Sequence, residues 1–133
     1  MDAEKGSVAR WGLHCLLRLD RIESGEVLMK EETKMRTTAQ VLVDCLEAEG
    51  VDVIFGIPGE ETLDLVFGIR DSKIRFIPVR HEQGAAFMAD VYGRLTGRAG
   101  VCLSTLGPGA TNLVTGVADA YLDGAPLVAI TGQ

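Results

Sequence analysis

Glu82 is the residue of this chain whose position is best suited to chemistry. It follows the short apolar run 74–79, which is typical of a buried strand, and it opens a segment of helix formers and small residues. Glu82 is therefore expected near the carboxyl end of a sheet, the edge at which open α/β sheets bind ligands. A half-buried carboxylate there could share a proton with a ligand. The alternative is that Glu82 only offsets the positive end of the helix dipole.

Two further loops fall at equivalent places. Gly-Ile-Pro-Gly at 56–59 follows a strand predicted over residues 51–55, and Gly-Pro-Gly-Ala-Thr-Asn at 107–112 follows a strand predicted over residues 100–105. Both loops join Gly to Pro, which is turn chemistry, and Gly lets a ligand approach the backbone. Because the carboxyl ends of parallel strands share one edge, we expect Pro58, Glu82 and Pro108 near the same edge.

The elements that must position these loops alternate regularly from Thr37 onward. A capping-box pattern at 37–40 opens a helix that Gly50 can end. Further helices are predicted around residues 63–67, over 81–95 with Gly97 as the stop, and over 112–121; the last strand is 127–131. This alternation predicts an α/β fold, a parallel sheet with right-handed crossovers and helices on both faces.

Taken in order, these motifs resemble a known family, the thiamine-diphosphate-dependent enzymes of the acetolactate synthase type. The resemblance is to the amino-terminal domain, which holds the aminopyrimidine ring of the cofactor. It runs from Thr37 to Gln133 and rests on residues 56–59, 80–83, 89–94, 107–112 and 126–133. It implies the fold of a pyrimidine-binding domain, of which this chain would hold an incomplete copy over residues 35–133.

The resemblance gives Glu82 a catalytic and cofactor-binding role. The matching glutamate of the family hydrogen-bonds N1′ of the aminopyrimidine and favours its imino tautomer, whose nitrogen then acts as the base toward C2. The cofactor carries the electron-sink chemistry, and the protein supplies orientation and electrostatics. His81 also matches a family position, but a lone histidine beside a helix start is more often a structural hydrogen-bond partner, so we assign it no catalytic role.

Other residues of the matched motifs become candidates through the same resemblance. The first loop would border the pyrimidine ring through backbone contacts, and the loop at 107–112 would shape the neighbouring wall; ordinary turn and helix-start chemistry is the alternative for both. Gln83 would reach the substrate side, unless it only lies on the helix surface. The cofactor-binding candidates besides Glu82 are Pro58, Gly59, Gly107, Pro108 and Asn112.

The activity implied is decarboxylation of a 2-keto acid such as pyruvate, with transfer of the two-carbon unit to a second keto acid, in branched-chain amino-acid biosynthesis. Another thiamine-diphosphate decarboxylase is an alternative, as is an inactive fragment or partner-binding scaffold. Glu60 stands where many acetolactate synthases carry a small residue, which leaves the substrate open.

The family anchors diphosphate and magnesium through Gly-Asp-Gly on a separate domain, a motif that this sequence lacks. We therefore expect thiamine diphosphate as the cofactor, magnesium and FAD only in the full-length enzyme, no metal site here, and no activity of this chain alone.

The full-length enzymes of the family form homodimers or tetramers, with the active site between two subunits. The helix after Glu82 carries the small residues Gly84, Ala85, Ala86, Ala89 and Gly93. They would let a second subunit approach closely, or they pack on the sheet of their own chain. The sequence leaves both possibilities open.

Composition limits the remaining functions and the location. The net charge of −6 gives no reason to expect nucleic acid, and no apolar run is long enough to span a membrane. The three cysteines share no metal spacing, and Cys45 and Cys102 are expected as reduced core residues, which suits a cytoplasmic protein.

Residues 1–34 mix charges with the apolar patch 11–17. We interpret them as an extension of unknown role, an over-early start or a helical arm.

Overall fold

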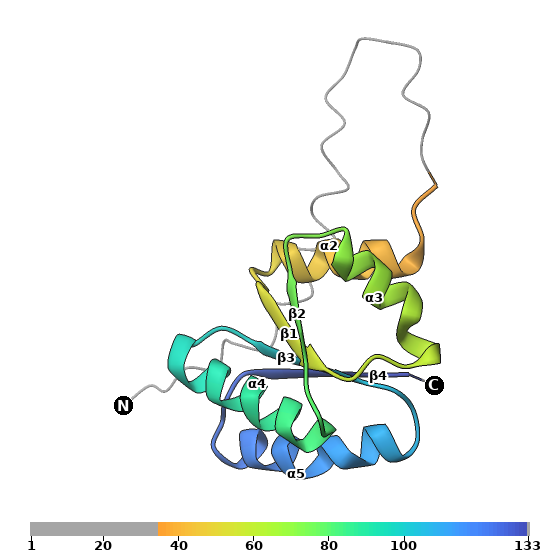
Figure 1. Ribbon diagram of the computed structural model, residues 1–133. Coiled ribbons are helices and arrows are strands. Elements are labelled where there is room, and N and C mark those ends of the chain that lie inside the picture. The colour runs from red at the N-terminus through yellow and green to blue at the C-terminus, as the bar shows by residue number, and fades with distance from the viewer. Residues whose placement is uncertain (1–34, 133) are drawn as a thin grey trace. The chain divides into compact units, whose positions relative to one another are not determined.

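The computed structural model describes residues 35–132, in which a four-stranded parallel sheet lies between two layers of helices (Figure 1). The strand order is β2-β1-β3-β4, and all neighbouring strands are parallel. The predicted α/β class is therefore confirmed, whereas our interpretation of residues 1–34 lies outside the described residues. The elements in chain order are α2 (Thr38–Ala48), β1 (Val53–Gly56), the 3-10 turn η2 (Glu60–Thr62), α3 (Leu63–Arg70), β2 (Arg75–Pro78), α4 (Glu82–Thr96), β3 (Gly100–Ser104), α5 (Pro108–Leu122) and β4 (Leu127–Thr131).

Local signals explain where most helices begin and end. In α2 the Thr37 hydroxyl accepts from the Gln40 N–H at 3.2 Å, and the Gln40 side chain accepts from the Thr37 N–H at 2.9 Å, which is the predicted capping box. Gly97 ends α4 in the left-handed region with φ 67°. The prediction for α5 was wrong by four residues: it begins at Pro108 and not at Asn112. A proline suits the first helical position because its missing N–H would have no partner there.

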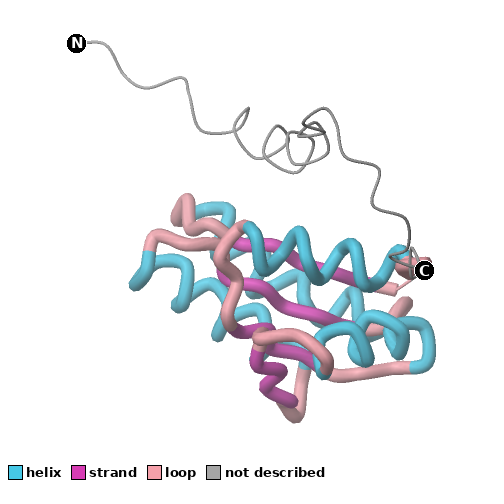
Figure 2. Tube along the Cα trace, turned by 90° about the horizontal axis from the view of Figure 1, so that it is seen from above, coloured by secondary structure: helices cyan, strands magenta, loops and turns pink. Residues whose placement is uncertain are grey.

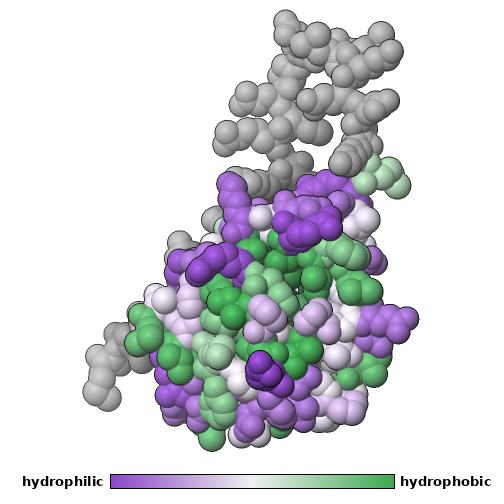
Figure 3. Space-filling view, viewed as in Figure 1, coloured by the Kyte–Doolittle hydropathy of each residue, from purple (hydrophilic) through white to green (hydrophobic). Residues whose placement is uncertain are grey.

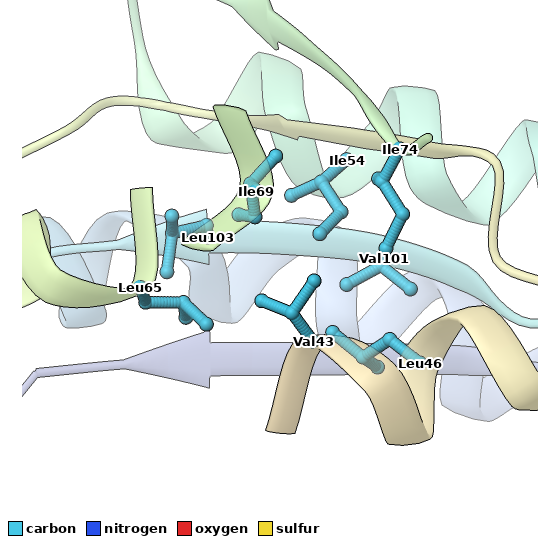
Figure 4. Close-up of a cluster of buried hydrophobic side chains, with 8 residues drawn as sticks. All are labelled: Val43, Leu46, Ile54, Leu65, Ile69, Ile74, Val101 and Leu103. Atoms are coloured by element: carbon cyan, nitrogen blue, oxygen red, sulfur yellow. The ribbon is translucent and has the colours of Figure 1, made fainter. Parts of the chain in front are cut away.

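Two cores form on opposite faces of the sheet, because successive strand residues point to opposite sides. On one face α2 and α3 cover the strands; Figure 4 shows this cluster, made of Val43, Leu46, Ile54, Leu65, Ile69, Ile74, Val101 and Leu103. On the other face Cys102 of β3 packs with Leu113 of α5 and with alanines of α4. Figure 2 shows from above how the strands run between the helices. β3 thus contributes to both cores.

The second core is built from small residues, so α4 lies very close to its neighbours. A Cβ at position 116 of α5 would lie 2.5 Å from the Cβ of Ala86, and a Cβ at position 93 would lie 2.4 Å from the Pro126 carbonyl oxygen. Ala85, Ala86, Ala89 and Gly93 are all buried inside the domain. Of the two possibilities for these four residues, packing within their own chain is the one observed. A Cβ at Gly84, by contrast, would meet nothing within 4 Å.

Some apolar surface stays exposed on the described domain. Apolar side chains gather on the face that β2 crosses in the view of Figure 1, as the space-filling view shows (Figure 3). The outer side of α4 exposes Phe87, Met88, Val91 and Leu95 to different degrees. No helix within residues 35–132 is long and apolar enough to cross a bilayer.

The Cys102 thiol is expected to be unreactive in the folded protein. It is fully buried, and burial raises its pKa to about 11, so only about one thiol in a thousand is ionised at pH 8. An aromatic disulfide reagent at pH 8 should leave Cys102 unmodified until denaturant is added, whereas the half-buried Cys45 gives the internal comparison. Peptide mapping by mass spectrometry assigns each modification. Rapid labelling of Cys102 in the native protein would contradict the packing of β3.

Candidate functional site

Three loops follow the carboxyl ends of neighbouring strands and meet at one edge of the sheet. In the register of the sheet Gly56 of β1 lies beside Pro78 of β2 on one side and beside Leu103 of β3 on the other. Backbone hydrogen bonds continue the ladder into the loops: the Ile57 N–H donates to the Leu103 carbonyl at 3.1 Å, and the Val79 N–H donates to the Gly56 carbonyl at 3.0 Å. The loops after β1, β2 and β3 are therefore held together, as the sequence predicted.

Glu82 is the first residue of α4 and is half-buried at this edge. Its carboxylate oxygen Oε2 accepts a hydrogen bond from Nδ2 of Asn112 on α5, at 3.0 Å. A Cβ at position 109 would lie 3.4 Å from the other oxygen, Oε1, so Oε1 lies over the bare backbone of the first turn of α5. The carboxylate of Glu82 thus lies against one face of α5, with Oε2 at Asn112 and Oε1 near Gly109, which is one helical turn earlier.

The pKa of Glu82 is lowered from its ordinary value, mainly because Asn112 donates to the carboxylate; His81 adds a smaller effect in the same direction. Partial burial opposes this shift because it disfavours the charged form. At neutral pH the side chain is therefore an anion that can accept hydrogen bonds. Such a group suits a ligand atom that carries a proton.

His81 has a local structural task. It is the N-cap of α4, and its Nδ1 accepts from the Gln83 N–H at 3.2 Å. The ring nitrogen thereby satisfies one of the backbone donors left without partners at a helix start. This arrangement agrees with the interpretation of His81 as a structural hydrogen-bond partner. Gln83, which is half-buried, uses its backbone N–H in the same cap.

Thr105, which the sequence analysis passed over as the end of a strand, links the loops to one another. Its hydroxyl donates to Oε2 of Glu61 on η2 at 2.9 Å. A Cβ at Gly59 would lie 2.7 Å from the Thr105 Cβ, and a Cβ at Gly109 would lie 3.2 Å from its Cγ2. Thr105 therefore lies between the loop after β1 and the start of α5. Nothing in the sequence distinguishes it from an ordinary strand threonine.

A second threonine fixes the loop that carries Pro58 and Gly59. The buried Thr62 hydroxyl accepts from the Gly59 N–H and donates to the Gly59 carbonyl, both at 3.1 Å. Gly59 is half-buried as a result, and Pro58 is exposed at the edge. The backbone of this loop is consequently held in one position.

The remaining candidates lie in the first turn of α5 or just before it. Gly107 precedes the helix with φ 57°, a conformation that favours glycine, and Pro108 is the first helical residue; both are exposed. Asn112 is half-buried one turn further along. Of the candidate residues, Glu82 and Asn112 share a direct side-chain hydrogen bond.

The motif at 89–94 lies away from this edge and ties α4 to α5. Asp90 is 1% exposed, and Arg94 binds it through a hydrogen bond from Nε to Oδ1 at 2.9 Å and an ion pair between Nη2 and Oδ2 at 2.8 Å. The same guanidinium pairs with Asp119 and Asp123 of the α5 region. These residues hold the scaffold together. No cluster of three or more potential metal ligands occurs within residues 35–132.

Comparison with known proteins identifies the family to which this chain belongs. The sequence profile of the family described as "Thiamine pyrophosphate enzyme, N-terminal TPP binding domain" matches residues 36–133. The chain is 54% identical over 95 residues to the probable acetolactate synthase large subunit of Methanocaldococcus jannaschii. The aligned residues cover 71% of this chain and 16% of that protein. It is 57% identical over 98 residues to acetolactate synthase of Mycobacterium bovis, covering 73% and 16%. It is 52% identical over 95 residues to acetolactate synthase isozyme 2 large subunit of Escherichia coli, covering 71% and 17%. The chain thus spans about a sixth of the length of these relatives.

Proposed function

We propose, on the premise that this chain belongs to the thiamine pyrophosphate enzymes through their N-terminal TPP-binding domain, that its sheet edge holds the aminopyrimidine end of thiamine diphosphate. The observation that carries the proposal is the Glu82 carboxylate, kept anionic by Asn112 and placed over the bare backbone of Gly109. The relatives named above are acetolactate synthases, which supports the same role for Glu82.

The residues present fit the pyrimidine ring chemically. A carboxylate can accept about four hydrogen bonds, so the bond from Asn112 leaves Glu82 with capacity for a ring nitrogen. Gly59 and Gly109 pack against Thr105 at positions where a side chain would be crowded, so the loop after β1 and the first turn of α5 would lie close to a bound ring. Pro58, Gly107 and Pro108 would border it, and Gln83 would lie toward the substrate. Thiamine diphosphate, when bound, supplies an acidic carbon and an electron sink for decarboxylating 2-keto acids.

In this proposal each side chain has a definite task. Glu82 would accept a hydrogen bond from the ring nitrogen after that nitrogen has taken up a proton from water, and the carboxylate would stabilise this protonated form. Thr62 and Thr105 hold the loops in place so that Glu82 and Gly59 do not have to be ordered when the ligand arrives. Preorganised groups aimed at the position of developing charge are the protein's main contribution to such reactions.

For the whole protein we propose acetolactate synthase-type chemistry, the joining of a decarboxylated 2-keto acid to a second keto acid. The reason is that relatives of which the aligned segment makes up about a sixth carry this name and share more than half of the aligned residues. Magnesium and FAD would then bind outside this chain, and two subunits would form the site. Residues 35–133 would be part of the pyrimidine-binding domain, and the cytoplasm would be its location.

The proposal can be tested on this chain with the aminopyrimidine part of the cofactor as the probe. An NMR titration should give shifts confined to residues 57–60, 82–83 and 105–112, with a dissociation constant on the order of 1 mM, because a fragment of this size gains little binding energy. Glu82→Gln should weaken binding about tenfold, since it removes a charge-assisted hydrogen bond.

Glu49→Gln is the matched control. It makes the same chemical change at an exposed position after α2, outside the residues expected to respond to the ligand, and its affinity should equal that of the wild type. The amide spectrum of each variant reports whether it is folded. Equal affinities of Glu82→Gln and the wild type, or shifts at another surface, would refute the proposal.

A further inference from the structure

The hydrogen-bond donor to the Glu82 side chain is the neutral amide of Asn112. No lysine or arginine within residues 35–132 forms an ion pair with this carboxylate. A cation in this place would lower the pKa of the carboxyl group further, and it would also cancel the negative charge that a ligand meets. The Asn112 amide favours the charged form without cancelling the charge. Glu82 therefore keeps its full negative charge for whatever binds at the edge.

The bond also determines which carboxylate oxygen is engaged. Asn112 lies three residues after Gly109, so both face the same side of α5. Oε2 is bound to Nδ2 of Asn112, while Oε1 lies beside the position where Gly109 has no side chain. The carboxylate cannot rotate without losing the hydrogen bond from Asn112 or moving away from this turn of α5. The hydrogen bond from α5 therefore restricts the orientation of the Glu82 carboxylate.

Thr105 closes the space on the other side of Gly109. Its Cγ2 would lie 3.2 Å from a Cβ at position 109, so a larger residue there would be crowded between Thr105 and Oε1. Gly109 itself is buried. The close packing of Thr105, Glu82 and the first turn of α5 therefore favours glycine at position 109.

We infer that Asn112 is a positioning residue for Glu82: its hydrogen bond to Oε2 fixes the orientation of the carboxylate and leaves Oε1 to accept a hydrogen bond from the ligand. Asn112 then acts through Glu82 and does not touch the ligand itself, which revises its direct cofactor-binding role expected from the sequence. The inference rests on the proposed function, because the ligand is the aminopyrimidine ring proposed above.

A side-chain carbon titration of Glu82 by NMR tests the contact without any ligand. In the wild type the midpoint should lie below the ordinary carboxyl value, as the lowered pKa requires. Asn112→Leu, which removes the donor, should raise the pKa, and Asn112→Asp, which replaces the donor with a second carboxylate, should raise it further. Thr115→Leu, an exposed position on the same helix, should leave it unchanged.

A double-mutant cycle with the aminopyrimidine probe then separates positioning from direct contact. Asn112→Leu should weaken binding about fivefold in the wild-type background, because Glu82 loses the hydrogen bond that orients it, and the loss should be clearly smaller in the Glu82→Gln background. Should Leu perturb the fold, Asn112→Asp, which has the same shape as asparagine, serves for both measurements, and the amide spectrum identifies a misfolded variant.

The outcomes are distinguishable. An unchanged midpoint in Asn112→Asp, or an equal loss of affinity in both backgrounds, would overturn the positioning role and leave the proposed function standing. Binding that does not depend on Glu82 would remove the proposed function, while a shifted midpoint would still support the contact between Asn112 and Glu82.

Discussion

Gly116→Ala is expected to lower the thermal midpoint of the domain by roughly 10 to 20 °C. The new methyl group would lie 2.5 Å from the Cβ of Ala86 and 3.0 Å from backbone atoms of Ala86 and Phe87. Backbone cannot rotate away as a side chain can, so α4 and α5 would have to separate across the second core. Alanine is the better helix former by about 1 kcal/mol, but overpacking of a buried site outweighs this gain.

Gly84→Ala provides the control within the same pair of helices. It makes the identical change inside α4, where a Cβ would meet nothing within 4 Å. Its midpoint should stay the same or rise by a few degrees, about 4 °C at most, through helix propensity and a less flexible unfolded chain. Thermal unfolding followed by circular dichroism compares the two variants directly. A Gly116→Ala protein as stable as Gly84→Ala would show that the helices do not cross as closely as described.

Arg94→Met is the second variant for which we expect a large loss, a midpoint lowered by on the order of 10 °C. The substitution removes the hydrogen bond and the ion pair that Arg94 makes with the buried Asp90. Asp119 and Asp123 would also lose their common cation, so like charges would face one another across α4 and α5. Removing one partner of a buried charged pair is far more destabilising than removing an exposed one.

Two comparisons make this prediction specific. Arg70→Met breaks an ion pair with Asp71 whose two side chains are 66% and 63% exposed, and it should lower the midpoint by no more than about 3 °C. Asp90→Asn combined with Arg94→Met should recover part of the loss, because it removes the buried charge. The same melting experiment measures all variants. Equal effects of Arg94→Met and Arg70→Met, or a double variant worse than Arg94→Met, would rule out the buried charge as the cause.

Much of the fold could be predicted because its signals are local. The capping box at Thr37 and Gln40, the stop at Gly97 and the Gly-Pro turns each need only a few neighbouring residues. The alternation of strands and helices then leaves few topologies for a parallel sheet. The order of the loops along the edge follows from that topology and not from any single residue.

The site was predicted less completely, because its contacts join distant parts of the chain. Glu82 and Asn112 are 30 residues apart and lie on different helices. The sequence placed both at one edge but could not show that one side chain donates to the other. Thr105 has no distinctive neighbour in sequence, and its role comes from the glycines that pack against it. The small residues of α4 were ambiguous because close packing within a chain and between chains demands the same residue types.

The central position of β3 has a consequence for the order in which the domain can fold. Only α5 and β4 follow β3 in the described chain, yet Val101 and Leu103 of β3 belong to one core and Cys102 to the other. Residues 36–99 can form local helix pairs and the β1–β2 contact but can close neither core. A growing chain on the ribosome therefore gains its cooperative stability late, after β3 and α5 have left the exit tunnel, and until then it exposes the apolar side of β1.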